Sequence, residues 1–190
     1  MRLQIAGVAL AIGLTFSAIS QAGGISGRMI GNTCAGCHGV NGASAGDTMP
    51  TIGGLPRSYI ENAMKQYRDG TRGATVMGRI AKGYNDQQIS AMSEFFATQQ
   101  WVAAQQNTDA SLAQRGSAIH AEHCESCHAK NGSAIANDAP SRVAGQWVNY
   151  LQLYLDNVHD PLNKHPKKGY IMKITKGEID AVLQFYASQK

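Results

Sequence analysis

Two stretches of the chain, 85–99 and 175–189, show the clearest helical spacing of apolar side chains. Each opens with residues that suit the start of a helix, Asn85 with Gln88 and Thr175 with Glu178, and the second pair has capping-box form. Apolar residues then recur three or four positions apart, as an amphipathic helix requires: Ile89, Met92 and Phe96 in one stretch, Ile179, Val182 and Tyr186 in the other. The pattern predicts two equivalent helices 90 positions apart.

The repeat extends over most of the chain. "GLPRSYI" from Gly54 and "GQWVNYL" from Gly145 both read as a glycine followed by a helix start with a shared tyrosine. Each copy therefore predicts a helix, a loop, a middle helix, a second loop and a closing helix, and no stretch alternates as a strand would. We expect an all-α fold of two domains, 23–105 and 106–190, joined by a polar, Gln-rich linker within 99–111.

The N-terminal 22 residues have the layout of a secretory signal. Arg2 precedes an apolar run from Ile5 to Phe16, and a small-residue site ends at Ala22. A membrane anchor, the alternative, needs about 20 apolar residues, and the run supplies about 12. The sequence predicts cleavage near Ala22, export to the periplasm and a mature chain without a membrane span.

The net charge of +4 becomes +3 when Arg2 leaves with the signal (4 − 1). Nucleic-acid binding needs basic residues clustered on one face, and this balance argues against it. The short run from Lys164 to Lys168 fits either a docking patch for an acidic partner or a solvated loop.

All four cysteines lie in two matched motifs, "CAGCHGVNG" at 34–42 and "CESCHAKNG" at 124–132. Two thiols separated by two residues can bond to both vinyl groups of a haem, and the adjacent histidine can then bind the iron. A zinc site and a thioredoxin-like redox pair are the alternatives, but neither fills the core of domains of about 80 residues. The motifs predict two covalently bound haem c groups, with these residues attached: Cys34, Cys37 and His38 at haem 1, Cys124, Cys127 and His128 at haem 2.

The spacing around the motifs resembles the class I cytochrome c family. Pro50 lies 12 residues after His38, and Pro140 lies 12 after His128. The resemblance implies two tandem class I domains in which each proline carbonyl accepts a hydrogen bond from its histidine. It also implies Met77, in the loop "GATVMGRIAKGY", as the sixth ligand of haem 1.

The sixth ligand of haem 2 has two candidates. Met172 is the only methionine of the second copy, and His/Met ligation is usual in small c-type carriers. However, Met77 lies eight residues before its helix cap (85 − 77), whereas Met172 lies three before its cap (175 − 172) and His165 lies ten before (175 − 165). We expect Met172, with His165 as the alternative; two histidines would give the lower potential.

Four stretches, "TVMGRIAKGY", "HAEHCESCH", "VAGQWVNYLQ" and "FYASQ", resemble the dihaem cytochrome subunits of flavocytochrome c sulfide dehydrogenases. The resemblance implies a heterodimer with an FAD-containing flavoprotein that oxidises sulfide, this chain accepting the electrons. In that family the loop corresponding to "NKHPKKGYIMKIT" carries methionines close to the Lys-Lys pair. Here His165 occupies one such place, and Met172 follows the pair.

Two other functions fit the same motifs. A free dihaem carrier would shuttle electrons between respiratory or photosynthetic complexes without a flavoprotein. A haem enzyme in its own right would need an open distal position, which His/Met ligation denies. We expect no catalytic residue in this chain, and a small cytochrome or an oxidase as the downstream electron acceptor.

Overall fold

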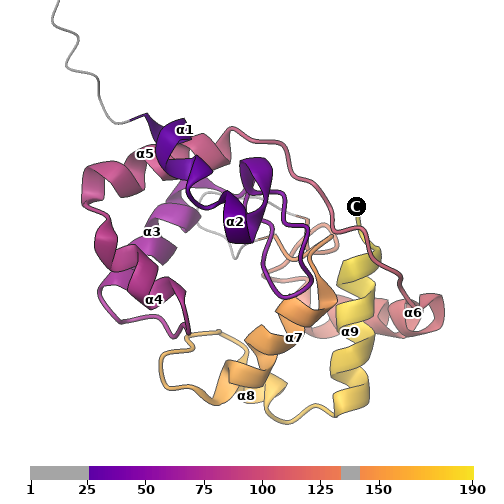
Figure 1. Ribbon diagram of the computed structural model, residues 1–190. Helices are drawn as coiled ribbons and strands as arrows, with labels where there is room; N and C mark the ends of the chain where they lie inside the picture. The colour runs from indigo at the N-terminus through magenta and orange to yellow at the C-terminus, as the bar shows by residue number, and fades with distance from the viewer. Residues whose placement is uncertain (1–25, 134–141) are drawn as a thin grey trace, which may run out of the picture.

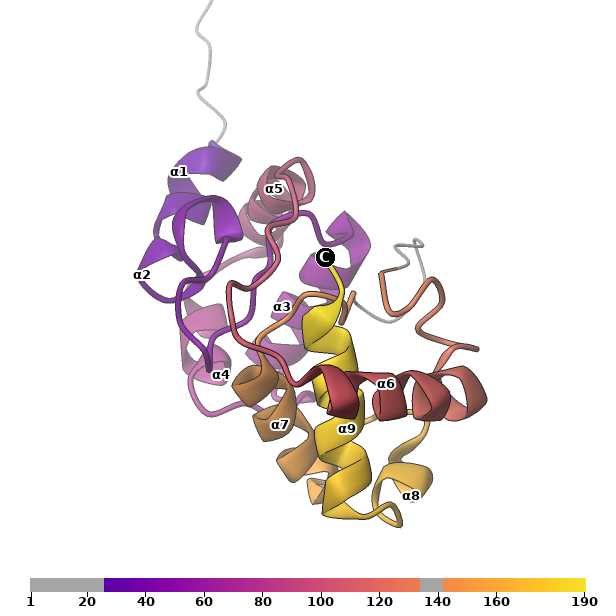
Figure 2. The same cartoon turned by 90° about the vertical axis from the view of Figure 1, so that its right-hand side faces the viewer.

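The computed structural model describes residues 26–133 and 142–190. The predicted signal sequence and Pro140 therefore lie outside the described residues. Within these ranges the chain forms helices and loops and no strand, which confirms the all-α prediction. Both views place α1–α5 on one side of the molecule and α7–α9 on the other (Figures 1 and 2).

The first half contains five α-helices and two short 3-10 turns. They are α1 (Gly27–Asn32), α2 (Ala35–His38), η1 (Val40–Gly42), α3 (Arg57–Arg68), α4 (Met77–Ile80), η2 (Ala81–Gly83) and α5 (Asp86–Ala97). The described part of the second half keeps the succession of entering, middle and closing helices, with a π-helical turn, η3, after the entering helix and a 3-10 turn, η4, after the middle one. Its elements are α6 (Ala110–Ile119), η3 (His120–Cys124), α7 (Val148–Asp156), η4 (Asn157–His159), α8 (Lys168–Ile171) and α9 (Lys176–Ser188). None of the described helices is long and apolar enough to cross a bilayer.

The predicted helix starts of α5 and α9 are confirmed. Both helices begin with a complete capping box, Asn85 with Gln88 and Thr175 with Glu178. Each box satisfies two backbone N–H groups that the first turn leaves unpaired. The apolar faces behind these caps then form the two cores. Ile89, Met92 and Phe96 are buried in the first core, and Val182, Leu183 and Tyr186 in the second.

In each half the entering helix crosses the closing helix at a glycine. A Cβ at Gly27 would lie 2.1 Å from the carbonyl oxygen of Ala91, and one at Gly116 would lie 2.0 Å from that of Ala181. Both crossings thus require the absence of a side chain. Gly27 is seven residues from Cys34 (34 − 27), whereas Gly116 is eight from Cys124 (124 − 116). The π turn η3 absorbs the extra residue, which is the usual effect of a single-residue insertion in a helix.

The segment expected to be a polar linker is fastened to both halves. Trp101 packs against the first core, and the guanidinium of Arg142 from the second half lies 4.8 Å above its ring. The Nε2 of Gln106 donates to the Gln146 carbonyl at 2.7 Å, and its Oε1 accepts from the Val148 N–H at 3.0 Å. This segment therefore fixes the two halves against each other rather than leaving them free to move.

Candidate functional site

The first motif ends in a buried histidine. His38 is the last residue of α2 and is 9% exposed. Its Nδ1 lies 2.9 Å from the carbonyl oxygen of Pro50, which has no proton and can only accept. Burial lowers the pKa of His38, so the ring is neutral, donates from Nδ1 and leaves Nε2 unprotonated. A neutral ring oriented in this way is what a metal ligand requires.

The second motif places its histidine in a similar environment. Burial, followed by the neighbouring His165 and His120, lowers the pKa of His128 to about 4. His128 is therefore neutral at physiological pH. The ring of His165, from the loop before α8, lies opposite it, with the ring centres 6.2 Å apart and the planes within 18° of parallel.

The Asn-Gly pairs that follow both motifs form equivalent tight turns. Asn41 and Asn131 each adopt a left-handed conformation with φ of 57°, and the next residues, Gly42 and Gly132, have φ of 79° and 82°. The carbonyl of each glycine accepts two backbone N–H groups from the segment that comes after the predicted proline: Ile52 and Gly53 in one copy, Val143 and Ala144 in the other. The turn thus joins the motif to the chain segment that carries the histidine's partner.

The methionines differ in their surroundings. Met77 begins α4 and is half-buried against the first core. Met172 caps the C-terminus of α8 and is 48% exposed. Met64 and Met92 are buried in the first core. The structure therefore packs Met77 against the first core and leaves Met172 at the surface.

All four cysteine thiols are free of disulfides. Burial raises the pKa of both Cys34 and Cys124, so these thiols are protonated near neutral pH. Within the described residues, no three His, Cys, Asp or Glu side chains form a group that could hold a metal ion by themselves. Each motif thus offers two free thiols and a neutral histidine, the donor set that a covalently bound haem requires.

A side chain of the second half holds the backbone next to Pro50. The Nε2 of Gln146 donates to the Thr51 carbonyl at 2.7 Å, and its Oε1 accepts from the Thr51 N–H at 3.1 Å. Thr51 is fully buried, and Gln146 is 3% exposed. Because Thr51 directly follows Pro50, Gln146 fixes the carbonyl that accepts from His38.

The same contact surface continues around the loop before Pro50. Trp147 donates from Nε1 to the Ser44 carbonyl at 3.2 Å, and Asn149 donates to the Asp47 carboxylate at 2.9 Å. The backbone N–H of Tyr150 also donates to the Asp47 carbonyl at 2.9 Å. The start of α7 is thus docked on the proximal loop of the first half.

An arginine that the sequence analysis did not single out lies among tyrosines at this junction. Arg72 donates to the Tyr59 hydroxyl at 3.0 Å, and its guanidinium lies 5.5 Å and 5.0 Å from the ring centres of Tyr59 and Tyr67. Tyr150 and Tyr154 of the second half interact with it electrostatically. None of the carboxylates in the described parts of the chain forms an ion pair with Arg72.

A charged group in such surroundings needs an anion to offset its desolvation. Haem carries two propionate carboxylates, which fit a guanidinium bordered by phenolic hydroxyl groups. No local signal marks Arg72, because its partners are spread over almost 100 positions of the sequence. The guanidinium of Arg72 thus places a positive charge where the two halves meet.

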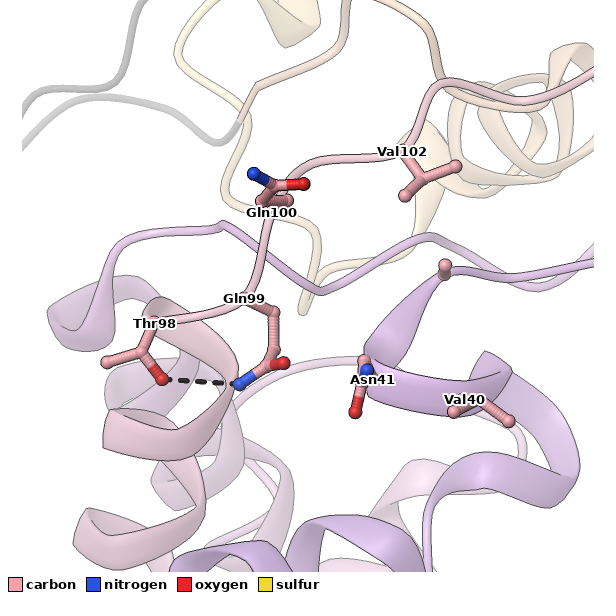
Figure 3. A pocket seen from close by; sticks show the side chains of 7 residues that line it. Val40, Asn41, Thr98, Gln99, Gln100 and Val102 are labelled. Carbon is pink, nitrogen blue, oxygen red and sulfur yellow. Dashed lines mark hydrogen bonds between the residues drawn. The ribbon is translucent and has the colours of Figure 1, made fainter.

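A pocket of about 380 Å³ lies elsewhere on the first half, between η1 and the segment after α5 (Figure 3). Its lining includes Val40, Asn41, Thr98, Gln99 and Val102. Thr98 and Gln99 are hydrogen-bonded to each other at 3.2 Å. The lining contains no histidine or cysteine, and it touches the first motif only at Val40 and Asn41, after the histidine.

Two matched Cys-x-x-Cys-His motifs, each with a neutral histidine in a duplicated all-α chain, define a dihaem c-type cytochrome. The chain belongs to the cytochrome c family, whose profile matches residues 27–100. It is 32% identical over 71 residues to cytochrome c-554(548) of Halomonas halodenitrificans, covering 86% of that protein and 36% of this one. Electron transfer by two covalently bound haem c groups follows from this membership.

Two further similarities bear on the kind of dihaem protein. The chain is 43% identical over 70 residues to the cytochrome subunit of sulfide dehydrogenase from Chlorobaculum tepidum, covering 37% of this chain and 63% of that one. The crystallised cytochrome c4 of Acidithiobacillus ferrooxidans superposes with a TM-score of 0.71 at 25% identity, covering 83% of this chain and 99% of that one. The fold is thus that of two class I cytochrome c domains in tandem.

Proposed function

We propose that this chain is the electron-accepting subunit of a flavin-dependent sulfide dehydrogenase in the periplasm. The similarity to the Chlorobaculum tepidum subunit carries the proposal, since it has the highest identity of the similarities described above. The four sequence stretches that resemble dihaem subunits of flavocytochrome c add support beyond the haem motifs. A flavoprotein partner with FAD would oxidise sulfide and pass electrons singly to this chain, which would bind no sulfide itself.

In this function the chain holds two haems and keeps water and other ligands from their irons. Bound haem supplies the one-electron chemistry of iron. We assign the attachment of haem 1 to Cys34 and Cys37 and its iron ligands to His38 and Met77. For haem 2 we assign Cys124 and Cys127 with His128. The domains that carry them are 23–105 and 106–190.

The remaining roles belong to side chains that orient or balance these groups. Pro50, and by the repeat Pro140, would fix the proximal rings through their carbonyls. Arg72 would pair with propionate carboxylates where the two halves meet. With both irons fully ligated by the chain, no residue is left to act as an acid, base or nucleophile, so we propose no catalytic residue.

A free dihaem carrier is the second candidate. One observation favours it: the likeness to cytochrome c4 covers 99% of that protein, whereas the likeness to the sulfide dehydrogenase subunit covers 63% of that subunit. Such a carrier would receive electrons from one complex and deliver them to a small cytochrome or an oxidase, without a bound flavoprotein.

Native mass spectrometry of the protein purified gently from its own periplasm separates the two functions. A complex with a flavin-bearing subunit, in which added sulfide reduces the haems, is expected. The isolated chain is the control, and sulfide should reduce it far more slowly. A chain that carries two haems, never co-purifies with a flavoprotein and gains no sulfide-driven reduction from the periplasmic fraction would overturn the proposal in favour of the carrier.

A further inference from the structure

We propose that His165 is the second iron ligand of haem 2, so that His128 and His165 hold this iron while His38 and Met77 hold the other. The assignment replaces Met172, which the sequence analysis expected. The assignment of His165 needs only that the chain binds haem. The direction of electron flow deduced from it below also rests on the proposed function.

The spacing of the two rings fits a shared iron. A histidine nitrogen binds a metal at about 2 Å, and the centre of its ring lies about 1 Å farther away. Two histidines on opposite faces of one iron therefore have ring centres about 6 Å apart. The measured separation between His128 and His165 is 6.2 Å, with planes within 18° of parallel. Ring faces in van der Waals contact would be closer, at about 4 Å.

The loop before α8 is built to hold His165 in place. The His165 N–H donates to Oδ1 of Asn163 at 3.1 Å, and its carbonyl accepts from the Lys168 N–H at 3.0 Å. Nδ1 accepts from the Lys167 N–H at 3.1 Å. When Nε2 binds iron, the ring proton must reside on Nδ1, and the bond from Lys167 is given up.

Two lysines of the same run also brace this loop. Lys164 donates from Nζ to the Pro161 carbonyl at 3.0 Å, and Lys168 donates from Nζ to the Asp160 carbonyl at 2.8 Å. The Lys168 contact spans the segment that carries His165, and the Lys164 contact closes the turn just before it. Of the two interpretations of the lysine run, a docking patch or an ordinary loop, these contacts favour a loop that positions a ligand.

Met172 lacks these features. It is 48% exposed, after the last turn of α8, and only three residues before the cap of α9. Met77 in the first half, by contrast, is half-buried against the first core. Counted back from the cap of the closing helix, Met77 lies eight residues away, which is nearer to the place of His165 (ten) than to that of Met172 (three).

Unequal ligands give the two haems different potentials. Methionine raises the potential of a haem relative to a second histidine. Haem 2 would therefore be the lower-potential site and haem 1 the higher. Electrons delivered by a flavin would pass from the second half to the first, and the first half would face the external acceptor.

Optical and EPR spectra of the fully oxidised protein test the ligands without any partner. We expect one methionine–iron charge-transfer band per protein, from haem 1, together with one low-spin signal of the bis-histidine type. Met77→Leu should remove the band, and the matched variant Met172→Leu should leave both features unchanged. Two methionine bands in the unmodified protein, or loss of a band in Met172→Leu, would overturn the assignment.

The histidine variants add an independent test. His165→Ala should leave haem 2 five-coordinate and quick to bind cyanide, while haem 1 stays low-spin. His165→Met should raise the lower of the two potentials in a redox titration toward the higher one. If His165→Ala leaves both haems low-spin with unchanged potentials, His165 is not a ligand. If the spectra show the expected ligands but sulfide does not reduce the haems through a flavoprotein, that result counts against the flavoprotein partner. It does not count against His165 as a ligand.

Discussion

The two halves share one fold but surround their motifs with different chemistry. In the first half, Gly31 lies against the Phe95 ring, where an added Cβ would come within 2.3 Å of a ring carbon. In the second half, His120 occupies the corresponding place and its ring lies 5.0 Å from that of Phe185. His120 Nδ1 also hydrogen-bonds the Tyr186 hydroxyl at 3.1 Å, and its Nε2 pairs with Glu125.

The difference shows what a duplicated core can tolerate. The π turn η3 accommodates one extra residue in the helix that precedes Cys124. The side chain in the place of Gly31, that of His120, is polar. A buried imidazole is costly unless both of its nitrogens have partners. Tyr186, where the first half has Phe96, supplies one partner and Glu125 supplies the other. The first half has an apolar proximal side, and the second has a satisfied polar network.

Replacing Arg72 tests whether its guanidinium pairs with a haem propionate where the two halves meet. Of the predicted changes in stability, this one should be the largest. If Arg72 pairs with haem propionates, Arg72→Met should lower the free energy of unfolding of the holoprotein by about 3–5 kcal/mol. Urea denaturation measures it. Arg57→Met, at an exposed ion pair with Glu94, is the control and should cost less than about 1 kcal/mol. A more stable Arg72→Met protein would mean that the guanidinium has no anionic partner.

Gln146 offers a way to disturb one haem from the opposite half. Gln146→Leu leaves the Thr51 N–H and carbonyl unpaired and should destabilise the protein by about 1–3 kcal/mol. Because the change reaches His38 through Pro50, the NMR shifts of haem 1 should move more than those of haem 2.

The matched control for Gln146 is Gln105→Leu, an exposed position that bonds only to the nearby Ala103 carbonyl. It should leave both haem spectra and the stability unchanged. Equal shifts at the two haems in Gln146→Leu would show that the contact holds the domains together without orienting His38.

The smallest expected effect comes from the matched capping boxes. Asn85→Ala and Thr175→Ala should each cost about 1 kcal/mol, because each removes an acceptor from the first turn of a closing helix. If the fastened linker makes the halves unfold together, both variants should shift one common thermal transition by a similar amount. Two separate transitions, each moved by only one variant, would show that the halves unfold independently.

The repeat, the all-α fold, the helix caps and the two haem groups were determined by the sequence itself. These features depend on short-range patterns, such as thiols two residues apart, a cap three residues before its partner, and apolar positions at helical spacing. The spacing of 12 residues also predicted the contact between His38 and Pro50 that the structure contains. The corresponding role of Pro140 stays a prediction.

The tertiary structure alone decided how the halves meet and which side chain lies opposite His128. Gln146 and Thr51 are 95 positions apart, and Arg72, which contacts Tyr59 and Tyr67, also acts electrostatically on Tyr150 and Tyr154 of the other half. Residue spacing left His165 and Met172 as competing candidates, because a loop can present either of them to the same haem face. Only the packing of that loop placed the ring of His165 opposite the ring of His128 and left Met172 exposed to solvent. Periodicity says which face of a helix is buried, but not what that face is buried against.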